Sequence, residues 1–234
     1  MITSAAGGPA PGDIVPPAAE VPPEAVRAYL GLLGYASLGS FSLLAHDAAN
    51  SPDIVVRLRL SRMAAAELQE IDLVEALFER HGGDASAAVS EFAPILNDFT
   101  VRARPRDWWE RLMRTYVGFN LLQDLLRELG GGLHEELREQ VLDTMCVSCH
   151  ADLVAEQLGP VLAADTKLAS RLALWGRRVV GDAIGLVHRA LAQNPALLEL
   201  LPETDGDGPA REAALVGRLQ TGHARRFARL GLKS

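Results

Sequence analysis

The sequence contains few cysteines and few aromatic residues, and both shortages narrow the class of protein. Only two of its 234 residues are cysteines, Cys146 and Cys149. Two cysteines so close together cannot cross-link a domain of this size, which argues against a disulfide-stabilised secreted fold. Aromatic residues make up 5% of the chain. Ala and Leu dominate instead, which favours helices over sheets.

The chain also lacks an excess of positive charge. Its net charge of −7 argues against a general nucleic-acid-binding surface, because phosphate neutralisation needs clustered Lys and Arg. No basic segment followed by an apolar run marks a signal peptide. We expect no membrane-spanning segment, since charges interrupt the long apolar stretches. These features predict a cytoplasmic protein that makes no membrane contact.

What the sequence does contain is 48% apolar residues, enough for a substantial core. Residues 1–23 are the exception, because they are rich in Pro and Gly and bury little. We expect this segment to be a disordered tail. From residue 24 onward, apolar residues recur at helical spacing, and no segment shows strand-like alternation.

Cap and breaker residues divide this helical part. Ser51, Asp84 and Asp165 are predicted N-caps, while glycines at 82–83 and 130–132 are predicted to end helices. Pro105 is expected to open a helix, and Gly159-Pro160 to bend or break one. The expected helices cover 24–49, 52–78, 84–92, 105–125, 133–158, 165–191 and 210–230.

This pattern predicts an all-α fold: an antiparallel four-helix bundle with additional C-terminal helices. The bundle is expected to span residues 24–202. Residues 203–234 are expected to form an acidic loop and a basic helix packed on the bundle. The arginines of that helix are expected to face solvent or neutralise the acidic body, with RNA contact as the sharper alternative.

Residues 146–150 spell Cys-Val-Ser-Cys-His, the pattern of covalent haem attachment. Haem attachment of that type needs an export route, and residues 140–145 are predicted to lie inside a helix. A redox-active dithiol remains open, because Cys146 and Cys149 would share a helix face. The favoured interpretation is two small buried thiols in a helix seam.

A pair of acids, Glu67 and Glu70, follows the small-residue stretch 63–66 and lies near the apolar stripe of its helix. Buried carboxylates are costly unless they are paired, hydrogen-bonded or bound to metal. The alternative is that both carboxylates are solvated at the edge of the stripe. For Glu70 alone, this alternative and a role as a ligand weigh about equally.

Four motifs in order resemble those of actinobacterial ferritin-like proteins of the tRNA-hydroxylase-like (MiaE-like) family. They lie at 63–67, 116–118, 171–178 and 223–226, and the resemblance covers about residues 26–232. It implies a ferritin-like antiparallel helix bundle. Members typically hold a carboxylate-bridged di-iron centre between the helices, and the tRNA hydroxylases use it with dioxygen.

Carried over position by position, the resemblance preserves only part of the di-iron ligand set. Glu67 matches the second-helix Glu, and His150 matches the fourth-helix His. Glu70 stands where the second helix has a His. Ser37, Phe119 and Val147 stand where acids are expected. A di-iron centre needs several carboxylates to balance the metal charge, so the resemblance implies a degenerate site.

Two interpretations of this site remain open. A single iron or manganese ion could be held by Glu67, Glu70 and His150, with Cys146 as a fourth ligand. The preferred interpretation is a metal-free polar cluster with no cofactor. In it, a protonated His150 pairs with one of the two carboxylates, and Asp124, which also matches a family acid, orients the His150 ring.

Three classes of function follow from these interpretations. One is a hydroxylase-like oxidoreductase with a mononuclear metal. Another is a cofactor-independent acid–base enzyme of specialised metabolism, or a small-molecule-binding protein, that uses Glu67, Glu70 and His150. The last is a non-catalytic binding or assembly protein. The aromatic pair Trp108-Trp109 also favours a homodimer.

Overall fold

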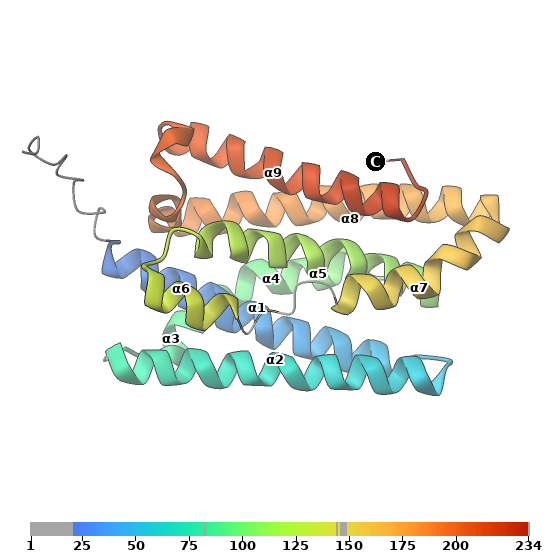
Figure 1. The fold of residues 1–234 in the computed structure, drawn as a ribbon, viewed down its shortest axis with the longest axis horizontal. Coiled ribbons are helices and arrows are strands. Elements are labelled where there is room, and N and C mark those ends of the chain that lie inside the picture. Colours follow the sequence, from blue (N-terminus) through green and yellow to red (C-terminus); the bar gives the residue numbers. More distant parts are fainter. Residues whose placement is uncertain (1–20, 82, 144, 146–148, 234) are drawn as a thin grey trace, which may run out of the picture.

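The first two long helices are joined by a short turn with an aspartate cap. The computed structural model describes residues 21–81, 83–143, 145 and 149–233, so the predicted tail lies almost entirely outside the described residues. Helix α1 (Pro23–Ala49) is followed by α2 (Ile54–His81), which runs back along it (Figure 1). The carboxylate of Asp53 accepts from the backbone N–H groups of Val55 and Val56 at 2.8 and 2.9 Å. Asp53, rather than the predicted Ser51, therefore caps α2.

Three helices lead to the third long element. The predicted cap Asp84 is confirmed, because its side chain accepts from the Ala87 N–H at the start of α3 (Ala85–Ser90). The sequence analysis missed α4 (Ala93–Arg102), which follows immediately. Asp107 caps α5 (Trp108–Gly130), so this helix begins after Pro105 rather than at it.

The fourth bundle element is interrupted, contrary to the prediction of one helix over 133–158. Helix α6 (Glu135–Leu142) ends in a turn at Asp143, and α7 (Cys149–Ala164) begins after it. Helix α7 then continues through Pro160 without a break, so only the bend remains of the predicted bend or break. Cys146 lies outside the described residues, so the dithiol and the haem pattern stay predictions.

Two further helices form the outer layer of the molecule. Helix α8 (Thr166–Gln193) begins at the predicted cap Asp165, whose side chain accepts from two backbone N–H groups. Short 3₁₀ turns η1 (Pro195–Leu200) and η2 (Glu203–Asp205) connect it to α9 (Gly208–Arg229). Figure 1 shows α1 and α2 along one edge, α5 in the middle, and α8 with α9 along the opposite edge. All regular structure in the described ranges is helical, which confirms the predicted all-α class.

Helix α1 supplies much of the core. Tyr29, Leu33 and Leu44 are fully buried, and Gly31 lies so close to α3 that an added Cβ would sit 2.6 Å from the Ala88 carbonyl oxygen. By length and composition alone, α1 also resembles a membrane-spanning helix, so the expected interruption by charges does not apply to this stretch. Burial of most of this stretch inside the bundle is the behaviour of a core helix.

Candidate functional site

Four helices bring the positions singled out in the sequence to the centre of the bundle. Ser37 of α1 donates a hydrogen bond from its hydroxyl to Glu70 Oε2 of α2 at 2.8 Å. Phe119 of α5 lies against His150 of α7, with ring centroids 5.0 Å apart. All four side chains are buried. The aligned positions of the four bundle helices therefore lie in two contacting pairs.

Packing between α2 and α7 fixes the neighbourhood of these pairs. Ala64 of α2, Leu153 of α7 and Phe119 belong to one apolar cluster. Glu67 lies one turn beyond Ala64, and His150 one turn before Leu153. Because an exposed ion pair between Arg59 and Glu156 sets an antiparallel register, Glu67 and His150 occupy the same end of this contact.

Glu67 is a buried acid whose charge is poorly compensated. Its side chain is 7% exposed, and Oε2 has no hydrogen-bond partner within the described part of the chain. Burial, and secondarily the neighbouring Glu70, raises the pKa of Glu67 to about 8. Glu67 is therefore protonated at neutral pH and can act as a hydrogen-bond donor.

Glu70 is better accommodated than Glu67. Burial raises the pKa of Glu70, while the hydrogen bond from Ser37 and the positive charge of Arg127 lower it. Arg127 lies two turns after Asn120 on α5 and carries one buried Nη atom that no described residue satisfies. The two neighbouring acids thus differ in environment, and Glu70 is the one that holds a negative charge more readily.

His150 is a buried, neutral base. Neither of its ring nitrogens has a hydrogen-bond partner among the residues that the structure describes. Burial lowers the pKa of His150 to about 4. Neutral imidazole offers one donor and one acceptor nitrogen, and both remain available for hydrogen bonding in His150.

Asp124 does not join this centre. Its carboxylate forms a bidentate ion pair with Arg226 of α9, on the side of α5 that faces the outer layer. The sequence analysis placed it beside the His150 ring because it matches a family acid. The register on α5 explains the difference: Asp124 lies five residues after Phe119, which at 3.6 residues per turn places it about 140° around the helix from Phe119.

The donor set does not fit a di-iron centre. Phe119 fills the third-helix position with a ring and Ser37 fills the first with a hydroxyl, so neither supplies an anionic oxygen. Among the residues described, no three His, Cys, Asp or Glu side chains form a metal-ligating group. Val147 and Cys146, also relevant to the predicted set, lie outside the described residues.

An apolar crevice opens on another side of Phe119, between α1, α4, α5 and α8. Its volume is about 90 Å³. Phe119 is thus shared between the polar centre and the crevice. The remaining lining is mostly aliphatic and aromatic, with three polar exceptions, Ser40, Thr100 and Arg114. The lining residues are Ala36, Gly39, Ser40, Leu43, Phe99, Thr100, Arg114, Gly118, Phe119, Leu121, Leu122, Ala183 and Leu186.

The sequence analysis missed a second buried polar cluster, around Asp47. Asp47 lies near the end of α1, yet it is fully buried. Its carboxylate accepts from Thr115 Oγ1 at 2.5 Å and pairs with Arg111 and Arg114 at 3.1 and 3.3 Å. Burial raises the pKa of Asp47, although these three partners lower it. The sequence around Asp47 could not predict its pairing with arginines that lie more than 60 residues away in the chain.

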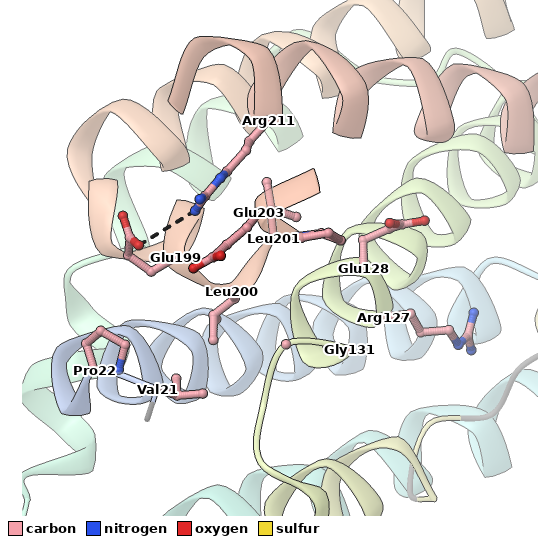
Figure 2. Close-up of a pocket in the computed structure, with 12 residues that line it drawn as sticks. Val21, Pro22, Arg127, Glu128, Gly131, Glu199, Leu200, Leu201, Glu203 and Arg211 are labelled. Carbon is pink, nitrogen blue, oxygen red and sulfur yellow. Dashed lines mark ion pairs between the residues drawn. The ribbon is translucent and has the colours of Figure 1, made fainter. Parts of the chain in front are cut away.

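A larger cavity, of about 730 Å³, lies where α5 and η1 meet the start of α1 (Figure 2). Its charges are largely paired: Arg211 faces Glu199 at 3.6 Å, and Glu128 accepts from Arg218 at 2.7 Å. In Figure 2, Arg127 points away from the Arg211–Glu199 pair. This cavity therefore offers few uncommitted groups to a ligand.

The arginines of α9 are mostly committed to the acidic body. Arg218 pairs with Glu128 and Asp205, Arg226 with Asp124, and Arg229 with Asp152. Tyr116 also donates from its hydroxyl to the backbone carbonyl of Arg226. These contacts agree with the expectation that the basic helix neutralises the bundle surface.

Comparison with known proteins gives one family. The family described as "Ferritin-like domain, actinomycetes" matches residues 23–204. No curated protein matches the chain. The match covers α1 to η1 and almost all of η2, which includes all four bundle elements and the buried centre. This chain therefore belongs to the actinomycete ferritin-like domain family.

Proposed function

We propose that this protein is a divergent ferritin-like protein that works without a metal and binds a small organic molecule in the crevice beside Phe119. The observation that carries this proposal is the placement of Phe119 itself. Its ring contacts His150 where the resemblance expects an acid, and it also lines the crevice. An aromatic wall between a polar centre and an apolar cavity suits ligand binding better than metal binding.

The residues at the aligned ligand positions support an assignment to a divergent branch of the tRNA-hydroxylase-like group. Ser37, Glu70 and Phe119 depart from the aligned ligands, whereas Glu67 and His150 keep them. Action on tRNA itself is disfavoured, because the ion pairs of Arg218, Arg226 and Arg229 leave little free positive charge on α9. Cytoplasmic location stays a prediction.

We propose that the polar centre of Glu67, Glu70 and His150 carries out no catalysis, and that the ligand binds in the crevice. None of the cavities described above is lined by Glu67, Glu70 or His150. General acid–base chemistry would need a substrate within hydrogen-bond reach of these groups. A route for a substrate would require Phe119 to swing away from His150, and a ligand filling the crevice is the event that could drive this.

A mononuclear metal site is the second candidate, favoured by one specific observation. Glu67 Oε2 and both His150 nitrogens are buried without partners in the described residues, and Glu70 supplies a second carboxylate nearby. Two carboxylates and one imidazole suit iron or manganese, which would supply oxygen activation when bound. Glu67, Glu70 and His150 would be its ligands, and Glu67 would have to give up its proton.

Metal analysis separates these two candidates. We expect protein purified without added metal or chelator to contain no stoichiometric iron or manganese, as do the variants Glu67→Ala and His150→Ala. Near-stoichiometric metal in the parent, lost in both variants, would overturn the metal-free proposal and restore the oxygenase candidate.

Binding to the crevice is tested with a small neutral probe, 1-hexanol, by isothermal titration calorimetry. Gly39 lines the crevice, and a Cβ added there would meet no atom within 4 Å. Because Gly39 is exposed at the edge of the crevice, Gly39→Leu should place a side chain over its opening and weaken hexanol binding without straining the helix. Gly217→Leu, at an exposed and equally open position of α9, is the matched control. Hexanol binding that is unaffected by Gly39→Leu would contradict the proposed site.

Homodimer formation remains a separate prediction. Trp108 and Trp109 are half-buried and pack against the apolar core, so the aromatic pair is less available than the sequence suggested. Sedimentation velocity at micromolar concentration would establish the oligomeric state directly.

A further inference from the structure

A second cavity meets the crevice near the start of α5. It has a volume of about 480 Å³ and is lined by His46, Thr100, Val101, Arg104, Pro105, Arg111 and Arg114. Thr100 and Arg114 line both cavities, so the two are adjacent. We call the second cavity the cationic cleft. Together they present an apolar end beside Phe119 and a basic end beside Arg104.

Positive charge in the cationic cleft exceeds the negative charge that faces it. Arg111 and Arg114 share one carboxylate, that of Asp47. Arg104 is exposed and makes no ion pair or hydrogen bond with any residue that the structure describes. This differs from the cavity in Figure 2, where Arg211 is matched by Glu199. The cleft therefore retains a net attraction for an anion.

Arg114 provides a buried and incompletely satisfied donor between the two cavities. Its side chain is 6% exposed, and its Nε is buried without a hydrogen-bond partner in the described part of the chain. A buried donor without a partner carries a free-energy cost that a ligand oxygen would relieve. Arginine also suits carboxylates, because its planar fork can donate two parallel hydrogen bonds.

We propose that the crevice and the cationic cleft together bind one amphipathic anion, a carboxylate with a short alkyl tail. The carboxylate lies between Arg104 and Arg114, and the tail enters the crevice toward Phe119. This inference rests on the proposed function and adds the chemical class of its ligand. Since a water-sized group occupies roughly 30 Å³, a crevice of about 90 Å³ holds about three carbon atoms at the end of a tail, and the carbons nearer the carboxylate lie in the adjoining cationic cleft.

Calorimetry with three six-carbon probes tests this proposal on the full chain. Hexanoate, 1-hexanol and hexylamine share a tail and differ in the charge of the head. We expect hexanoate to bind at least tenfold more tightly than hexanol, and hexylamine more weakly than either. Arg104→Ala should weaken hexanoate about fivefold and leave hexanol unchanged, as expected for the loss of one solvent-exposed charge. Arg62→Ala removes an exposed charge from α2, away from both cavities, and should change neither.

The outcomes separate the ligand class from the site. Equal binding of hexanoate and hexanol, with both weakened in Gly39→Leu, would overturn the carboxylate and leave the crevice as a site for neutral ligands. Hexanoate binding that Arg104→Ala weakens but Gly39→Leu does not would overturn the shared site, because the tail would then lie elsewhere. Absence of measurable binding by any probe at millimolar concentration would overturn both proposals.

Discussion

Two buried polar regions on the same helix differ in how their charges are satisfied. Asp47, near the end of α1, accepts from a threonine and pairs with two arginines. Ser37, ten residues earlier, leads instead to Glu70, Glu67 and His150, where several polar atoms have no described partner. Buried groups with partners stabilise an architecture, whereas buried groups without partners cost stability and persist for another reason.

The comparison predicts that the Asp47 cluster contributes most to stability. Asp47→Ala leaves Arg111 and Arg114 without their carboxylate in a buried site, and we expect it to lower the free energy of unfolding by roughly 3–5 kcal/mol. Urea denaturation monitored by circular dichroism measures the change. Glu91→Ala breaks an exposed ion pair with Arg27 and should cost less than about 1 kcal/mol. Similar costs for both variants would remove the distinction between the regions.

Replacement of Glu67 should raise the free energy of unfolding, whereas replacement of Asp47 should lower it. Its pKa is about 8 in the folded protein against an ordinary value of 4.5. Between these values the folded chain keeps a proton that the unfolded chain loses, so stability falls as the pH rises from about 4.5 to 8. Glu67→Gln removes this dependence and should be more stable than the parent by roughly 2–4 kcal/mol above pH 8.

Unfolding free energies of the parent and Glu67→Gln between pH 5 and 9 test this prediction. Glu79→Gln, an exposed acid on the same helix, is the control and should leave the profile unchanged. A Glu67→Gln variant that is less stable than the parent throughout would show that the carboxylate is ionised and bound to a partner.

His150 should give a smaller effect at acidic pH. Its pKa is about 4 in the folded protein against an ordinary value of 6.5. In this interval the unfolded chain binds a proton that the folded chain does not, so stability rises with pH from about 4 to 6.5. His150→Phe should flatten this rise by roughly 1–3 kcal/mol. His223, whose pKa is also lowered to about 4 by burial, accounts for a remaining rise.

Thermal unfolding of His150→Phe and of the double variant with His223→Phe would measure the two contributions. If the acidic arm of the profile is the same in His150→Phe and the parent, the imidazole is not a buried neutral base.

Alanine substitutions at two glycines of α1 should change stability least. Their signs should distinguish a position with open space around it from a tightly packed one. Gly39 borders the crevice and has open space around it, so Gly39→Ala should stabilise the protein by about 0.5–1 kcal/mol through helix propensity. An added Cβ at Gly34 would lie 2.8 Å from a methyl group of Val89, so Gly34→Ala should destabilise it. Melting temperatures of the two variants test the pair, and equal shifts would contradict an open crevice.

Much of the fold could be predicted because local signals agree with it. Asp84 and Asp165 cap the helices that they were expected to cap, and the apolar spacing identifies the long helices. The missed helix α4 carries Pro94 in its first turn, where proline is tolerated, but it is only 10 residues long and offers few turns of apolar spacing. The predicted continuous helix over 133–158 was wrong at Asp143, because propensity alone does not identify an interruption that tertiary packing allows.

The candidate site was predictable only in part. Alignment to the family selected Glu67, Glu70 and His150, and all three are buried. Asp124 was selected on the same basis, yet its carboxylate pairs with Arg226, which lies 102 residues further along the chain. Cys146 and Val147 stay untested positions of the predicted ligand set. The periodicity of the sequence shows which residues share one face of a helix. The interaction partner of a side chain on that face depends on which other helix packs against it.

By itself, the sequence determined the all-helical class, the capped starts of α3 and α8 and the residue types that replace the metal ligands. Those features depend on backbone hydrogen bonding, local periodicity and side-chain chemistry, all of which act over a few residues. Only the tertiary structure decided that Phe119 touches His150, that Asp47 is buried between two arginines, and that the crevice adjoins the cationic cleft. These contacts join helices far apart in the chain, and close packing between them decides which buried groups find partners and which do not.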